Sequence, residues 1–97
     1  MTKLTIEQVT FNLGRIPGWK LAEDQMALYR TFTFFDFVTA VRFVNMLAEY
    51  VPHEDYQPEI RIAGPMVTCT LTTHQVKGLT GKDFALAQQI NKLYLQS

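Results

Sequence analysis

The residues of this sequence best suited to acid–base chemistry are its two histidines, His53 and His74. His74 closes the alternating stretch 66–73, and a glycine turn and the start of a helix at Thr80 follow it. Because an imidazole titrates near working pH, a histidine at the end of a strand can carry protons in a small active site. The alternative is a structural role, in which His74 bonds a nearby backbone group or the loop before Thr80.

A metal site is a second kind of chemistry to consider, at the cluster His53-Glu54-Asp55. No second group of ligands completes a coordination set, so the sequence predicts no metal. A solvated loop histidine beside two acids explains His53. No nucleotide-binding loop, Ser-His-Asp set or cysteine-based motif is present either. We therefore expect no cofactor.

Composition and charge narrow the class of protein. The chain has 97 residues, which fits one domain over residues 1–97 with a modest core. Nine basic and nine acidic residues cancel, so no net field attracts nucleic acid or an anionic membrane. No apolar run approaches the roughly 20 residues that span a bilayer, and the N-terminus lacks a signal-peptide core. The single cysteine, Cys69, fits a buried thiol in a reducing compartment. The expected location is the cytoplasm.

The elements that must position these residues follow an α-β-β-α-β-β-α order. The capping box Thr5–Gln8 predicts a first helix, and Asp36 predicts an N-cap for a long one. Alternation of apolar and polar residues predicts the strands. We expect a four-stranded antiparallel sheet with about three helices on one face, an α+β fold. The expected ranges are helices over 5–13, 36–50 and 80–95 and strands over 19–22, 26–34, 59–63 and 66–73.

The long helix carries apolar residues on more than one side. Phe37, Val41, Val44 and Ala48 line one face, and further apolar residues spread over much of the rest. A helix of this kind is buried on two sides. One face is expected on the sheet. The other meets either a second subunit or the terminal helices of the same chain.

Motifs along nearly the whole chain resemble one family. The most specific stretch is Leu71-Thr-Thr-His74 followed by Gly78-Leu79-Thr80 and Asp83. The other segments that carry the likeness are Gly18-Trp19, Phe32-Thr-Phe-Phe-Asp-Phe37, Ala48-Glu49, Pro58-Glu59 and Val67. In these residues the chain resembles pterin-4a-carbinolamine dehydratase. The resemblance implies the α+β fold already read from the pattern, and dimers or tetramers.

Active members of that family carry a His-His-Pro run before the third strand and a third histidine after the fourth. The resemblance implies that these imidazoles surround the pterin and move protons as the 4a-hydroxyl leaves. His74 fills the third position. If His53 were the first histidine, three extra residues would have to fall between His53 and His74, in or between paired strands. An insertion inside a strand reverses the facing of the residues beyond it.

The second alignment matches Pro58 to the proline of the family. The interval from Pro58 to His74 is then 16 positions (74 − 58), as in the family, and the extra residues fall in the loop after Pro52. Lengthening a loop costs little free energy. We prefer this alignment, which puts Tyr56 and Gln57 at the two histidine positions. Neither side chain is a good proton carrier at neutral pH.

Two further residues match the pterin site of the family. Asp83 is a residual catalytic candidate with His74, although a helix cap explains it fully. Trp19 resembles a pocket-side tryptophan, although a hydrophobic anchor between the first helix and the sheet is the interpretation we favour. The vestigial ligand-binding positions are therefore Tyr56, Gln57, Pro58, Trp19 and His74.

Three functions follow from the resemblance. Tyr56-Gln57-Pro58-Glu59-Ile60 looks similar to a segment of family members that act as RuBisCO assembly factors, some of them carboxysomal. The chain departs from the carboxysomal pattern by keeping Thr73-His74 and Gly78-Leu79-Thr80. We expect a non-catalytic RuBisCO assembly protein first, and a dehydratase that uses His74 second. The third is a dimerisation partner of a transcription regulator.

Overall fold

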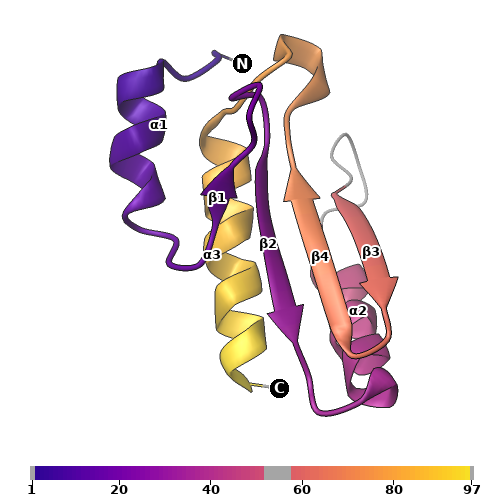
Figure 1. Ribbon diagram of the computed structural model, residues 1–97. Helices are drawn as coiled ribbons and strands as arrows, with labels where there is room; N and C mark the ends of the chain where they lie inside the picture. The colour runs from indigo at the N-terminus through magenta and orange to yellow at the C-terminus, as the bar shows by residue number, and fades with distance from the viewer. Residues whose placement is uncertain (1, 52–57, 97) are drawn as a thin grey trace.

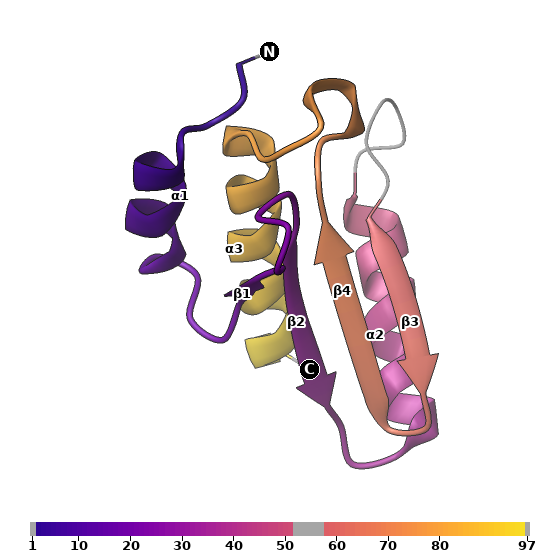
Figure 2. The same ribbon diagram turned by 45° about the horizontal axis from the view of Figure 1, so that its top comes forward.

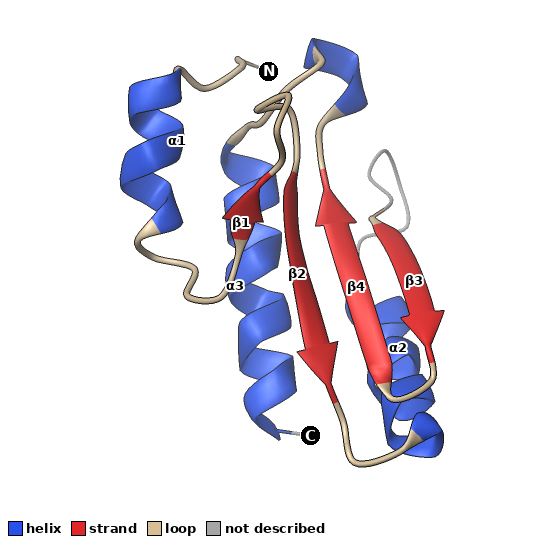
Figure 3. Ribbon diagram, viewed as in Figure 1, coloured by secondary structure: helices blue, strands red, loops and turns tan. Residues whose placement is uncertain are grey.

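The computed structural model describes residues 2–51 and 58–96, and it has the expected α+β architecture (Figures 1 and 3). The helices and strands follow one another in the order that the sequence predicts, with one short 3-10 helix in addition. Their bounds are α1 (Ile6–Leu13), β1 (Lys20–Leu21), β2 (Leu28–Thr33), α2 (Phe37–Tyr50), β3 (Glu59–Ala63), β4 (Met66–Leu71), η1 (His74–Val76) and α3 (Gly81–Gln96).

The four strands form one antiparallel sheet in the order β1-β2-β4-β3. β4 therefore lies in the middle, although it is the last strand in the chain (Figure 1). The β3–β4 ladder runs without a break from Glu59↔Thr70 to Ala63↔Met66, and only Gly64 and Pro65 connect the two strands. Gly64 has a φ of 58°, which suits glycine in so tight a turn.

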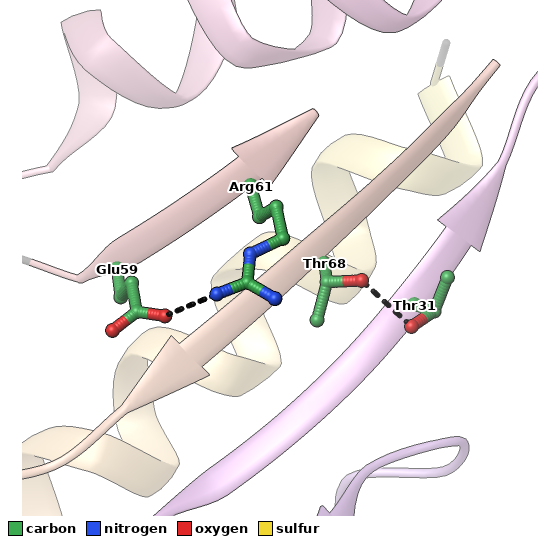
Figure 4. Close-up of polar contacts among 4 residues, drawn as sticks. All are labelled: Thr31, Glu59, Arg61 and Thr68. Atoms are coloured by element: carbon green, nitrogen blue, oxygen red, sulfur yellow. Dashed lines mark hydrogen bonds and ion pairs between the residues drawn. The ribbon is translucent and has the colours of Figure 1, made fainter. Parts of the chain in front are cut away.

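The two faces of the sheet differ in kind. α2 and α3 lie behind the sheet, and α1 lies beside the β1 edge (Figures 1 and 2). On the covered face, Val67, Cys69 and Leu71 of β4 are buried. The opposite face is polar: Thr31 and Thr68 share a hydrogen bond of 2.9 Å, and Glu59 faces Arg61 at 3.9 Å (Figure 4). The period of two seen in the sequence thus separates core from solvent.

Aromatic rings fill the space between the sheet and its helices. Phe32 of β2 stands 4.7 Å from Tyr94 of α3 and 5.2 Å from Phe43 of α2, measured between ring centroids. Trp19 meets Phe32 edge-on at 6.2 Å. Tilted and edge-to-face pairs of this kind add to the stabilisation that burial provides. The core is therefore continuous across β2, α2 and α3.

The structure decides which of the two apolar faces of α2 is buried. Ala40, Phe43 and Leu47 are its buried residues, whereas Phe37 is 57% exposed and Ala48 is exposed. The sequence left this choice open because α2 carries two apolar stripes, and period alone does not say which of them meets the sheet.

A polar tie joins three elements behind the sheet. Asn91 of α3 accepts hydrogen bonds at its Oδ1 from Trp19 Nε1 (2.8 Å) and Arg30 Nη1 (2.7 Å). The Arg30 guanidinium also donates to the Pro17 carbonyl and lies 4.5 Å from the Phe32 ring centroid. Gly18 leaves room for it, because a Cβ there would stand 2.6 Å from Arg30 Cζ. This tie explains how a charged residue occupies the covered face of β2.

Candidate functional site

His74 lies in a short loop between β4 and α3. The predicted strand over 66–73 ends at Leu71, and His74 starts the 3-10 helix η1 instead of following directly on the strand. The reason lies in β2, whose last pair with β4 is Leu28↔Leu71. Beyond it the chain turns into the β1–β2 hairpin, so the Thr72 hydroxyl bonds the Met26 carbonyl and the strand ladder stops.

Backbone hydrogen bonds close the His74 loop into a compact unit. Thr73 N–H donates to the Gly78 carbonyl at 2.9 Å, and Gly78 N–H returns a longer bond of 3.4 Å. Lys77 adopts a left-handed conformation with φ of 51°, which lets the chain reverse within so few residues. The His74 side chain is exposed, and it makes no hydrogen bond to any described residue. The backbone bond that a structural role would require is therefore not seen among those residues.

Beneath this loop lies a buried polar cluster of Thr73, Thr80 and Asp83, whose exposed fractions are 5%, 2% and 0%. Asp83 Oδ2 accepts from the Thr73 hydroxyl at 2.7 Å and from Thr80 N–H at 2.9 Å. The two threonine hydroxyls are 3.0 Å apart. Because the single hydroxyl hydrogen of Thr73 goes to Asp83, Thr80 is the donor in that pair. Asp83 thus ties the start of α3 to the strand end that carries His74.

The sequence found part of this cluster. The spacing Thr80-x-x-Asp83 predicted the bond from Thr80 N–H to the Asp83 carboxylate, which the structure contains. It gave no sign that Thr73 also binds Asp83. Thr73 falls outside the alternation of threonines along β4 and has the parity of the buried residues Cys69 and Leu71. Alternation therefore signals its burial, but not the carboxylate that it binds.

The structure separates the remaining predicted site residues. Trp19 is buried and packs against Phe32, so it serves as a core anchor at that position. Pro58 directly precedes β3 and is partly buried. His53, Tyr56 and Gln57 lie outside the described residues.

The regular ladder between β3 and β4 bears on the two alignments of the sequence. Within this chain the ladder has no bulge, because every residue from Glu59 to Ala63 pairs with one residue of β4. An odd insertion inside a paired strand would leave such a bulge. The match of Pro58 to the proline of the His-His-Pro run stays a prediction.

The described residues do not provide a reactive cysteine, a metal site or a membrane-spanning helix. Burial raises the pKa of the Cys69 thiol to about 12, so Cys69 is not a nucleophile at neutral pH. No group of three or more His, Cys, Asp or Glu residues within 2–51 and 58–96 could hold a metal ion. In the same ranges, no helix combines the length and the apolar character that a bilayer crossing requires.

Comparisons with known proteins agree with this geometry. The family model for pterin 4 alpha carbinolamine dehydratase matches residues 2–93. A "Putative pterin-4-alpha-carbinolamine dehydratase" of Xanthomonas euvesicatoria pv. vesicatoria is 40% identical over 97% of this chain and 80% of its own length. A protein of the same name from Cyanothece sp. strain PCC 7425 is 40% identical over 89% of this chain and 87% of its own length.

Among solved structures, the chain is similar to one described as a transcriptional coactivator/pterin dehydratase from Brucella melitensis. The two superpose with a TM-score of 0.89 at 32% identity, over 96% of this chain and 99% of the other. The fold, the match over residues 2–93 and the His74 loop lead to one conclusion. The chain belongs to the pterin-4a-carbinolamine dehydratase family.

Proposed function

We propose that this chain is a non-catalytic member of its family that binds another protein, and that its client is RuBisCO during assembly. The observation that carries the first half is the unbroken β3–β4 ladder, in which no bulge marks an inserted residue. With Pro58 taken as the proline of the family, Tyr56 and Gln57 would stand at the two histidine positions of the active enzymes.

The chemical consequence is a loss of proton carriers. A tyrosine side chain ordinarily titrates at about pH 10, and a glutamine side chain does not titrate. A positioned general acid or base typically contributes about 10²–10⁴-fold to a rate. The site therefore keeps one imidazole, that of His74, where active members have three.

The choice of RuBisCO rests on the segment Tyr56–Ile60, which looks similar to that of family members that act as RuBisCO assembly factors. Its described part opens β3, an edge strand of the sheet. Glu59 is exposed and Ile60 is partly buried there. Unpaired backbone groups on an edge strand can bind an extended segment of a client. The place of action would be the cytoplasm or a carboxysome.

The test is assembly of RuBisCO large subunits with and without the protein, followed by native mass spectrometry. We expect a complex and a higher yield of assembled enzyme. Glu59→Lys on β3 should weaken both, whereas Lys20→Glu on the opposite edge strand β1 should not. If neither complex nor yield responds to the wild-type protein, RuBisCO is not the client.

A second candidate is a dehydratase that uses His74. The observation in its favour is the buried Thr73–Thr80–Asp83 cluster, which holds the His74 loop at the end of β4. The names of the relatives point to the same reaction.

Supplying 4a-hydroxytetrahydropterin and following the quinonoid product by absorbance separates the two candidates. Our proposal expects no turnover from the wild type and a gain from Tyr56→His/Gln57→His. Turnover by the wild type that disappears in His74→Ala would establish the dehydratase and overturn the non-catalytic assignment.

A third candidate is a dimerisation partner of a transcription regulator. Its support is the description of the Brucella melitensis protein as a transcriptional coactivator. Mixing the purified chain with candidate regulator dimerisation segments and measuring mass by light scattering tests it. A mixed complex of defined stoichiometry would favour this role over RuBisCO assembly.

A further inference from the structure

A cavity of about 310 Å³ lies between the N-terminal segment, the start of α1 and the β1–β2 turn, and it adjoins the end of the His74 loop at Leu79. Its apolar lining includes Val9 and Leu79, which are buried, and Met26, which is partly buried. Its volume is at the lower end of the range for small-molecule sites. Thr73, His74 and Asp83 do not line it, so it is not part of the candidate site described above.

Two opposite charges also line this cavity, those of Lys3 and Asp24. They do not pair with each other, because the one ion pair among the described residues joins Glu59 and Arg61. Both side chains are exposed. A ligand with both an ammonium and a carboxylate group could therefore pair with Asp24 and Lys3 at the same time.

Hydrogen bonds hold the backbone next to each of these two charged residues. The aliphatic part of Lys3 lies over Gly78, where an added Cβ would come within 2.5 Å of Lys3 Cε. The next residue, Leu4, donates its N–H to the Leu79 carbonyl at 2.7 Å. Asp24 Oδ1 accepts from Met26 N–H at 2.9 Å, which leaves Oδ2 without a partner among the described residues. Both charged residues therefore stand on backbone that hydrogen bonds hold beside the apolar lining.

We propose that this cavity binds a free α-amino acid with an apolar side chain. The side chain lies against Val9, Met26 and Leu79, the ammonium group faces Asp24 and the carboxylate faces Lys3. The lining favours this class because it combines apolar residues with one cation and one anion, beside the neutral polar residues Thr5 and Gln25. A simple hydrocarbon would leave both charges unused, and a singly charged ligand would satisfy only one.

The test uses L-leucine as the probe, with methyl resonances followed by NMR. Saturable shifts are expected for the methyl groups of Val9, Met26 and Leu79, and none for Val44 in α2. Two analogues isolate the charges: 4-methylpentanoate lacks the ammonium group, and 3-methylbutylamine lacks the carboxylate. Each should bind about fivefold more weakly, the factor expected for loss of one exposed ion pair.

Matched variants separate the site from general charge effects. Asp24→Asn keeps the acceptor for Met26 N–H but removes the charge, and Lys3→Gln removes the opposite charge. Each should weaken leucine binding about fivefold, whereas their controls Glu23→Gln and Lys20→Gln, which do not line the cavity, should leave it unchanged. The proposal is wrong if leucine gives no saturable shift, or if both analogues bind as well as leucine does.

Discussion

At the scale of single residues, the buried cluster under the His74 loop is the most constrained feature. Asp83 is fully buried and accepts two hydrogen bonds, one from each threonine of the cluster. The spacing of Thr80 and Asp83 was visible in the sequence, but the partner across the loop was not. Thr73 has the parity of the buried residues of β4, so alternation indicates its burial, but alternation cannot say which carboxylate it binds.

Removing this carboxylate should destabilise the protein. Asp83→Ala leaves the Thr73 hydroxyl and Thr80 N–H without an acceptor in a buried place, which costs about 1–3 kcal/mol for each unsatisfied group. The urea midpoint should fall with little change in slope, as measured by circular dichroism. Lys82→Ala, at the exposed neighbouring position, is the control. An unchanged midpoint for Asp83→Ala would show that the cluster contributes nothing to stability.

The reactivity of the Cys69 thiol can be used to test whether this residue is buried in the folded protein. Its pKa is raised from 9.0 to about 12 by desolvation, so the neutral thiol is favoured in the folded state. The stability that depends on this thiol is present below pH 9 and decreases as the pH rises toward 12. At pH 8, Ellman's reagent should react slowly with the folded protein and rapidly after unfolding in urea. Fast reaction in the absence of denaturant would contradict the buried position.

The contribution of Asp36 to stability should be lost at low pH, whereas that of Cys69 is lost at high pH. Hydrogen bonds from the Thr39 side chain and backbone lower the pKa of its carboxyl below the ordinary 3.8. A depressed pKa means that the contribution is present above the unfolded value and is lost as the pH falls through the folded value. Asp36→Asn, which can still cap α2, should make the acid limb of the unfolding curve shallower. Glu49→Gln serves as the control at the other end of the helix.

At the scale of elements, the strands were predicted well because alternation and the turn residues agree. The Gly64-Pro65 turn and the ladder on either side of it match the sequence. The buried face of α2 and the helix η1 were not predicted. α2 has two apolar stripes of similar quality, and η1 depends on β2 ending opposite Leu71, which is a long-range fact.

Asn91 connects α3 to β2 and to the loop before β1, so its substitution should lower the stability of the fold. Asn91→Leu would leave the Trp19 indole N–H and an Arg30 donor without their shared acceptor. We expect a loss of about 1–3 kcal/mol of stability, because the indole is buried. The measurement is urea unfolding followed by tryptophan fluorescence, with Lys92→Leu at the adjacent exposed position as the control. Equal stability of the two variants would show that the tie between α3, β2 and the loop before β1 is dispensable.

At the scale of the whole molecule, apolar side chains remain exposed on and around α2. Phe35, Phe37 and Val38 are 95%, 57% and 57% exposed, and they lie within four consecutive positions of the chain. Of the two partners that the sequence left open for the second face of α2, the terminal helices do not cover this end. A second copy of the chain is therefore the partner that we predict.

If a second copy covers these residues, a charge introduced at the start of α2 should lower the molecular mass of the protein in solution. Val38→Glu should shift an oligomer toward the monomer in light scattering at micromolar concentration, because a carboxylate is costly to bury in an interface. Leu95→Glu, on α3 and 83% exposed, is the matched control and should leave the mass unchanged. A wild-type protein that is already monomeric would refute the predicted self-association.

The strand order also constrains how the chain folds during synthesis. β4 occupies the centre of the sheet but lies after residue 65, and its pairing with β2 joins residues such as Leu28 and Leu71. Contacts so distant in sequence form slowly. The sheet cannot close until more than two thirds of the chain has left the ribosome, and α3 must follow before the core is covered. Until then the nascent chain presents the apolar stripes of α2 to whatever chaperone meets it first.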